Sequence, residues 1–407
     1  MDSIKRLKYA CYSSNMTMSV VSSLSPVLFL TFRTLYGISY SLMGLLVLIN
    51  FVTQLGIDLV FSFFSHKFNI ARTVKAIPLI AIVGLVIYAV WPWLFPGAVY
   101  AGLVVGTIIF SAAAGLAEVL ISPVIAALPS DDPDREMSKL HSVYAWGVVA
   151  VIAISTLFLL VAGNTAWQWL ALLFTLIPLA SALLYVGAKV PTMETPEKAS
   201  GALHLLGNKG VWLCVLAIFL GGAAECTMAQ WSSSYLEMAL GVSKVWGDLF
   251  GVALFSVMLG LGRTLYSKIG QNIGRVLTLG AAGATACYLI AALVNLPVIG
   301  LLACAFTGFC TSMLWPGNLV VASSRFPAGG VFIYAMMAAG GDLGASVAPQ
   351  LIGLITDGVI AHPGATQLAH SLALTPDQLG MKLGMLVGAL FPLAGIFLYR
   401  RLWKTQK

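Results

Sequence analysis

The chain has 407 residues, of which 59% are hydrophobic and 9% are charged, and its mean hydropathy is +0.94. No water-soluble globular domain approaches this composition, so a soluble enzyme or a nucleic-acid-binding protein is excluded in spite of the net charge of +7. The composition is that of a membrane protein that crosses the bilayer many times.

A helix needs roughly 20 apolar residues to cross about 30 Å of hydrocarbon. The sequence contains twelve such runs, which predict an all-α fold with twelve transmembrane helices. The first run continues directly from a short basic leader without a cleavage site of small residues, so we expect a retained helix and not a signal peptide. The predicted spans are residues 10–32, 40–65, 72–93, 98–128, 139–162, 165–188, 211–236, 247–268, 274–294, 297–322, 329–356 and 379–400.

The distribution of the basic residues predicts the orientation of the chain. Most of the 22 Lys and Arg fall in connections that share one side of the membrane with the N-terminus, and only Arg33, Lys244 and Lys382 fall on the other side. Because cytoplasmic loops carry an excess of Lys and Arg, both termini are expected in the cytoplasm. We therefore expect a monomeric, multi-pass protein of the inner (plasma) membrane, with the lipid bilayer as its surroundings.

Motifs for enzymatic chemistry are missing from the sequence. The six cysteines all fall inside predicted spans and form no CxxC pair, which predicts neither disulfides nor a metal site. There is no phosphate-binding loop, no zinc-protease motif and no nucleophile elbow. We expect no enzymatic activity and no cofactor.

The two halves of the chain resemble each other. The longest polar connection follows the sixth span and predicts a six-helix bundle over 1–188, a cytoplasmic linker over 189–209 and a second six-helix bundle over 210–407. Each internal match joins a span, or the loop after it, to its counterpart six spans later. The matches are Asn15–Ser23 with Glu225–Ser233, Asn69–Arg72 with Asn272–Arg275, Gly115–Pro123 with Gly308–Pro316, and Tyr144-Ala with Tyr334-Ala. Parallel six-helix repeats predict a transporter whose binding site lies between the halves.

Over essentially its whole length the chain resembles the major facilitator superfamily. Its Asn-Ile-Ala-Arg and Asn-Ile-Gly-Arg loops are similar to the basic loop that follows helices 2 and 8 in that superfamily. The acidic start of that loop motif is missing, because His66-Lys67 stands in its place. The resemblance implies two pseudo-symmetric six-helix bundles that alternate the exposure of a central site.

Two carboxylates inside predicted spans are candidates for coupling transport to protons. Glu118 lies in Gly115-Leu-Ala-Glu, followed by a proline and a fifth span with aromatic residues and Gly147, which resembles the fucose permease branch. In that branch the helix-4 acid handles protons and sugar, and this role would carry over to Glu118. The first-helix acid of fucose permease is replaced by Asn15, whereas Glu225 in helix 7 is similar to the acid of the glucose and galactose transporters. Either acid could instead be permanently neutral or held in a structural ion pair.

Further polar residues within the spans are candidates for substrate or gating contacts. Sugar recognition uses amides and carboxylates for hydroxyl groups and aromatic rings for the apolar sugar faces. Many aromatic residues of membrane proteins only anchor the protein at the membrane interface or pack between helices. The charged gating candidates could instead form a structural ion pair. The substrate candidates are Asn15, Asn50, Gln54, Tyr144, Trp146, Gln230, Trp231, Tyr235, Trp315 and Asn318, and the gating or interdomain candidates are Asp58, Arg263, Asp342 and His141.

The favoured hypothesis is a secondary active transporter that imports a small polar solute, a neutral monosaccharide of the hexose type, by proton symport. The alternative is a proton-coupled exporter of a drug or metabolite, and a membrane sensor that transports nothing ranks lower. Sodium could replace the proton, because carboxylates and backbone carbonyls bind it without a readable motif.

Overall fold

The computed structural model describes residues 3–64, 67–129, 133–191, 207–269, 272–326 and 330–404, and the described residues outside helices form short turns. Most of the predicted linker, 192–206, lies outside this part of the chain. Among the described residues, eleven helical segments are long and apolar enough to cross a membrane, and α5 (Pro133–Ala162), whose apolar part is Trp146–Ala162, supplies the twelfth. The prediction of twelve transmembrane helices is confirmed.

The spans follow the predicted order, and several of them consist of two helices in succession. The helices of the first half are α1 (Ser3–Tyr36), α2 (Tyr40–Phe64), α3 (Ile70–Leu94), α4 (Val99–Ala126), α5, α6 (Trp167–Phe174) and α7 (Leu176–Tyr185). Those of the second half are α8 (Lys209–Leu240), α9 (Lys244–Trp246), the π-helix η6 (Gly247–Ala253), α10 (Leu254–Ile269), α11 (Ile273–Leu293), α12 (Pro297–Thr311), α13 (Pro316–Arg325), α14 (Gly330–Ala361), α15 (Pro363–Ser371), α16 (Pro376–Gly388) and α17 (Leu390–Lys404).

Proline explains where three spans are interrupted. Proline has no backbone N–H, so the carbonyl four residues before it loses its helical partner. Pro178 lies four residues after Phe174, where α6 ends before α7, and Pro392 lies four residues after Gly388, where α16 ends before α17. Pro316 lies four residues after Ser312, in the break between α12 and α13. The interruption at Ser312 frees a carbonyl that takes part in the candidate site.

The repeated Asn-Ile-x-Arg sequence forms the same helix cap in both halves. The side chain of Asn69 accepts a hydrogen bond from the backbone N of Arg72 at 3.0 Å, at the start of α3. The side chain of Asn272 accepts one from the N of Arg275, also at 3.0 Å, at the start of α11. Asparagine at this position satisfies an amide that the helix leaves unpaired, so the internal match has a local structural cause.

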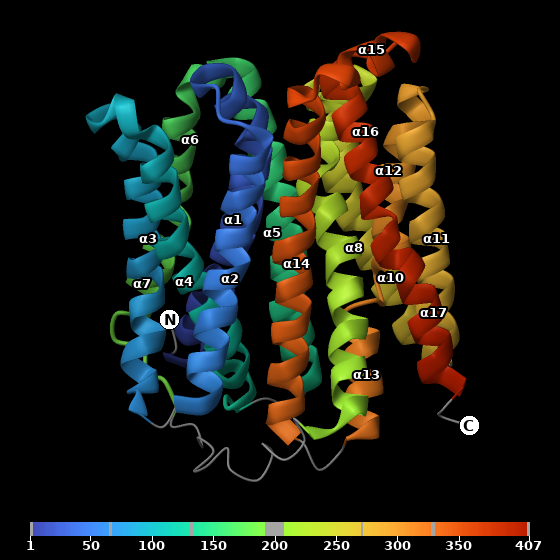
Figure 1. Ribbon diagram of the computed structural model, residues 1–407. Coiled ribbons are helices and arrows are strands. Elements are labelled where there is room, and N and C mark those ends of the chain that lie inside the picture. The colour runs from blue at the N-terminus through green and yellow to red at the C-terminus, as the bar shows by residue number, and fades with distance from the viewer. Residues whose placement is uncertain are drawn as a thin grey trace. The chain divides into compact units, whose positions relative to one another are not determined.

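The chain forms two compact units. The N-terminal unit consists of Met1–Thr31 and Ile49–Ser200. Within it α3 packs along α4, and α3 also contacts α6 and α7 (Figure 1). Its apolar core includes Leu7, Val74 and Leu120, from α1, α3 and α4.

The C-terminal unit consists of Gly201–Lys407 together with Phe32–Leu48, the corner formed by the end of α1 and the start of α2. Within it α8 packs along α14, α11 packs along α12, and α14 along α16 (Figure 1). Its apolar core includes Val211, Leu277 and Met337, from α8, α11 and α14.

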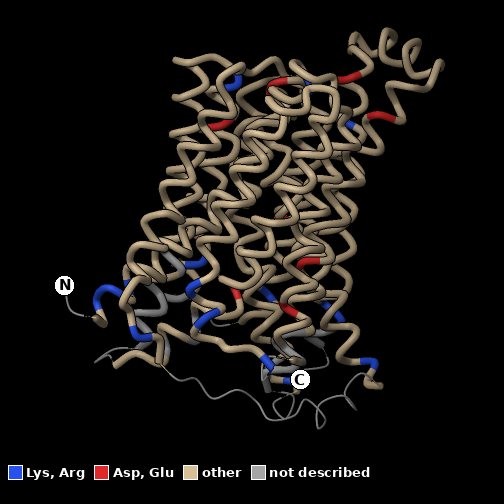
Figure 2. Tube along the Cα trace, turned by 90° about the vertical axis from the view of Figure 1, so that its left-hand side faces the viewer, with Lys and Arg blue, Asp and Glu red and all other residues tan. Residues whose placement is uncertain are grey.

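The three basic residues that break the predicted charge pattern are each held by a partner. Arg33 pairs with Asp377 at 2.9 Å, and Lys244 pairs with the fully buried Asp248 of η6 at 3.3 Å. Lys382 donates to the carbonyls of Ala292 and Val294 at the end of α11, at 3.2 and 3.3 Å. Most charged positions in Figure 2 lie toward the ends of the helices, whereas the middle of the bundle is largely uncharged.

Candidate functional site

A polar stripe joins α2 to α4 inside the N-terminal unit. Asn50, Gln54 and Asp58 follow one another at intervals of four residues on α2, and all three are at most 7% exposed. Residues four apart lie on one face of a helix. The Oδ1 of Asn50 accepts a hydrogen bond from the Oγ of Ser111 on α4 at 2.5 Å. One turn further along, the two helices come close at Gly115, where a Cβ atom would lie 3.1 Å from the Cα of Gln54.

The stripe ends at two acids. Carboxylate oxygens of Asp58 and Glu118 lie within 4.8 Å of one another. Asp58 is 5% exposed, whereas the side chain of Glu118 is exposed. Sequence analysis gave these acids separate roles, Glu118 in coupling and Asp58 in gating, and the structure brings them together. Two carboxylates at this distance repel each other when both are ionised, so the pair can hold a proton between them.

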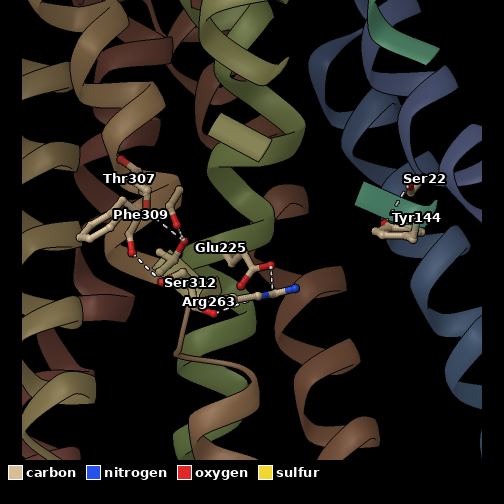
Figure 3. Close-up of polar contacts among 9 residues, drawn as sticks. Ser22, Tyr144, Glu225, Arg263, Thr307, Phe309 and Ser312 are labelled. Carbon is tan, nitrogen blue, oxygen red and sulfur yellow. Dashed lines mark hydrogen bonds and ion pairs between the residues drawn. The ribbon is translucent and has the colours of Figure 1, made fainter. Parts of the chain in front are cut away.

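Hydrogen bonds tie α1 to α5 in the same unit. Asn15 Nδ2 donates to the carbonyl of Leu140 at 2.6 Å, and Ser19 Oγ donates to the carbonyl of Tyr144 at 2.9 Å. The hydroxyl of Tyr144 donates to Ser22 Oγ at 3.2 Å (Figure 3). Asn15 and Tyr144, both substrate candidates, are thus also part of a helix contact.

Of the two other candidates on α5, the structure describes the side chain of only one. Trp146 is 69% exposed, so its ring is not packed within the protein. The side chain of His141 lies outside the described part of the chain.

In the C-terminal unit Glu225 forms an ion pair with Arg263. Glu225 lies near the middle of α8, and its Oε1 is 3.3 Å from Nη2 of Arg263 on α10 (Figure 3). The Glu225 side chain is 13% exposed and that of Arg263 is 44% exposed. The sequence left open whether Glu225 is held in an ion pair, and Arg263 was grouped with Asp58 and Asp342 as a gating candidate. The structure instead places Arg263 beside Glu225.

The break before α13 holds Arg263 in this position. Arg263 Nε donates to the carbonyl of Ser312 at 3.1 Å. Pro316 has no N–H to offer that carbonyl, so the guanidinium takes the place of the missing helical donor. The Oγ of Ser312 in turn donates to the carbonyl of Phe309 at 2.8 Å (Figure 3). The freed backbone carbonyl therefore fixes the orientation of the basic side chain.

Trp315 and Asn318 lie next to this break. A Cβ atom on Gly222, one turn before Glu225 on α8, would lie 3.0 Å from the Trp315 ring, so the indole packs against this glycine. Asn318 is 1% exposed, and its Nδ2 lies 2.6 Å from the Leu314 carbonyl and 3.3 Å from the Ala217 carbonyl. Trp315 is thus near Glu225, whereas Asn318 joins α13 to α8.

Trp231 and Tyr235 are packing residues in this conformation, because both are completely buried. Trp231 Nε1 donates to the carbonyl of Pro349 at 2.9 Å, and the Tyr235 hydroxyl donates to the carbonyl of Ala291. Gln230 is 8% exposed on the same helix. Asp342 on α14 is 4% exposed and follows Gly341, against which the Trp315 ring also packs.

Sequence reasoning missed three contributors to these clusters. Ser111 and Ser312 are small hydroxyl residues of a kind common in membrane helices, and nothing in their local sequence distinguishes them. Pro316 was noticed only as the end of an internal match, although its missing N–H predicts a free carbonyl at Ser312. The spacing of Asn50, Gln54 and Asp58 was a readable signal for a polar helix face.

Comparison with known proteins places the chain in a family. No curated protein matches it by sequence. Among solved structures, it is similar to the D-xylose-proton symporter (TM-score 0.72, 15% identity, covering 96% of this chain and 97% of that one). It is also similar to the nucleoside transporter NupG (0.70, 13%, 99% and 100%) and to FucP in its outward conformation (0.60, 17%, 99% and 99%). At these identities the likeness shows the fold alone. The sequence profile of the Major Facilitator Superfamily matches residues 10–349, and the chain belongs to this superfamily of membrane transporters.

Proposed function

We propose that the chain imports a neutral monosaccharide of the hexose type together with protons. The observation that carries the proposal is the pair of carboxyl groups, Asp58 and Glu118, within 4.8 Å of one another on membrane-spanning helices. A charge inside a span is costly unless it is paired, protonated or in contact with water. Because the buried Asp58 and the exposed Glu118 can share one proton, the pair offers a site that is loaded from the side on which Glu118 is exposed.

The hexose assignment is supported by the chemistry of the polar residues. Glu225 and Arg263 provide an acceptor and donors for hydroxyl groups, and the Trp315 ring lies one helical turn away against Gly222. Carbohydrate sites combine such polar groups with an aromatic face. Similar solved structures include a D-xylose-proton symporter and also a nucleoside transporter, so an experiment must distinguish these substrate classes.

Transport would use alternating exposure of a site served by both six-helix repeats, as the internal matches suggest. In this scheme the proton site belongs to α2 and α4, and the hydroxyl-binding groups belong to α8, α10 and the break between α12 and α13. We also propose that both termini lie in the cytoplasm, because Lys and Arg gather on that side of the predicted spans.

Uptake by proteoliposomes tests this function. Purified protein is reconstituted, and accumulation of radiolabelled hexoses, pentoses and nucleosides is measured with and without an inward proton gradient. We expect a hexose to accumulate only when the gradient is present. Glu118→Gln and Asp58→Asn should abolish accumulation but retain exchange of labelled for unlabelled sugar, because exchange needs no net proton movement.

Glu237→Gln is the matched control, since it also neutralises an acid of a spanning helix but lies outside these clusters. Hexose uptake that ignores the proton gradient would refute proton coupling. Accumulation of nucleosides but not hexoses would refute the substrate class, and net proton-driven efflux would identify an exporter.

A further inference from the structure

The Glu225–Arg263 pair has hydrogen-bonding capacity that the described part of the chain does not use. Among the described residues, the buried Oε2 atom of Glu225 has no hydrogen-bond partner. Arg263 makes two contacts within the same part of the chain, from Nε to Ser312 and from Nη2 to Glu225. Its fork of five N–H donors therefore retains hydrogens for another partner. A buried carboxylate oxygen without a partner is unfavourable, and a purely structural ion pair would avoid this cost by bidentate contact.

The exposure of the pair indicates that a solute can reach it. The side chain of Arg263 is 44% exposed although α10 is part of a membrane span. Exposure of a guanidinium to hydrocarbon is strongly unfavourable, so this side chain faces water or a solute. Glu225 is nearly enclosed at 13% exposure, and Arg263 thus forms the open side of the pair.

We propose that Glu225 and Arg263 together bind two adjacent hydroxyl groups of the transported sugar. Glu225 Oε2 accepts the hydrogen of one hydroxyl, and an N–H of Arg263 donates to the oxygen of its neighbour. This assignment rests on the proposed function, since it names the groups that would recognise a hexose. A vicinal diol fits because each of its hydroxyls both donates and accepts, as an adjacent acceptor and donor require.

The surrounding structure holds both groups ready for such a ligand. Ser312 fixes the guanidinium through Nε, and Gly222 lets the Trp315 ring approach α8 one turn from Glu225. The ring can cover an apolar face of the sugar while its hydroxyls meet the charged pair. Glu225 acts here as an anion that accepts hydrogen bonds, which assigns the carriage of the proton to Asp58 and Glu118.

Binding of deoxysugars tests the assignment. The dissociation constants of the transported hexose and of its monodeoxy derivatives are measured by calorimetry on purified wild-type protein, Glu225→Gln, Arg263→Gln and Glu237→Gln. In the wild type, removal of either of two adjacent hydroxyls should weaken binding by about 10- to 100-fold, because it leaves a buried polar group unpaired. Glu225→Gln should bind the parent sugar about 10- to 100-fold more weakly and lose discrimination at one of the two positions.

Arg263→Gln should lose discrimination at the neighbouring position, and Glu237→Gln should retain the full wild-type pattern. Each protein variant combined with each deoxysugar forms a double-mutant cycle. The coupling energy of that cycle separates a direct contact from a general loss of affinity. Thermal unfolding without ligand reports whether each variant is folded. Should Glu225→Gln fail to fold, Glu225→Asp replaces it, because this change keeps the ion pair and moves the acceptor by one methylene.

The outcomes separate the two proposals. Hexose binding with wild-type affinity and wild-type discrimination in both Glu225→Gln and Arg263→Gln would overturn the diol assignment and leave hexose transport intact. A wild-type protein that binds no hexose would overturn the proposed function and the diol assignment with it. Residual proton-driven uptake in Glu225→Gln, at raised sugar concentration, is expected if the proton is carried by the α2–α4 acids.

Discussion

Asp357 caps a helix that is distant from it in sequence, and its removal should release that helix end. Its Oδ1 accepts a hydrogen bond from the backbone N of Tyr40 at 3.2 Å, and its Oδ2 accepts one from the N of Ser41 at 2.6 Å. These amides are at the start of α2, where a helix leaves N–H groups unpaired. Asp357 is on α14, so one carboxylate anchors the corner formed by residues 32–48 within the C-terminal unit.

The expected magnitude follows from these two bonds. Loss of an Asp cap costs about 0.5–2 kcal/mol, and a carboxylate near a helix N-terminus contributes about 0.3–1 kcal/mol more. For Asp357→Ala we therefore expect the start of α2 to become easier to open by about 2 kcal/mol, which corresponds to about a 30-fold change in the opening equilibrium. Asp357→Asn keeps one acceptor oxygen but loses the charge, and about half of this effect is expected.

Hydrogen exchange measures this opening directly, because local amide protection reports the free energy of local unfolding. In Asp357→Ala the amides of Tyr40 and Ser41 should exchange about 30-fold faster than in the wild type. Asn272→Ala is the control, since it removes the cap at the start of α11 and should affect only that helix. Unchanged exchange at the start of α2 in a folded Asp357→Ala protein would refute the reasoning.

Four further substitutions test the packing by thermal unfolding in detergent. Gly308→Ala should cost about 1–3 kcal/mol, since its Cβ would lie 2.2 Å from the Phe255 carbonyl oxygen, whereas Gly115→Ala, with nearest atoms at 3.1 Å, should be near neutral; the reverse order would contradict the helix contacts. Trp231→Phe should cost about 1 kcal/mol and change hexose affinity less than twofold, and a large affinity loss would restore its substrate role. Asn318→Leu should cost about 1–3 kcal/mol without altering affinity, measured by unfolding and by calorimetry.

The order and number of the spans could be predicted from the sequence, but their interruptions could not. Long apolar runs are a direct signal because every backbone polar group must be paired inside the bilayer. Proline is a less direct signal. Pro26 and Pro349 lie inside the continuous helices α1 and α14, whereas Pro178 and Pro316 follow a break. A proline therefore indicates a freed carbonyl but does not by itself decide whether the helix continues past it.

The residues of the candidate site could also be predicted only in part. Glu118, Glu225 and Arg263 could be singled out because charge within an apolar run is rare. Their partners could not, since pairing depends on which helices are adjacent. Trp231 was a substrate candidate by residue type, yet its ring is enclosed and its N–H is bound to a backbone carbonyl. The sequence of a span is the same whether its aromatic ring binds substrate or packs between helices, so only the burial of the ring distinguishes these two roles.

The two halves differ in sequence at the residues that form the two polar clusters, one in each unit. Aligning Asn69 with Asn272 places Ala253, Val257 and Leu261 of the second half at the positions of the α2 polar stripe, so that stripe has no counterpart there.

Aligning Gly115 with Gly308 likewise places Thr311 at the position of Glu118. The first half, in turn, has Asn15 where the second has Glu225. A symmetric duplication would carry two equal sites, whereas the proposed function needs one group that exchanges a proton and another that holds the solute. Under the proposed function, divergence at these few positions supplies that difference, while the glycines that bring α4 to α2 and α12 to α10 keep the helix packing of the two halves alike.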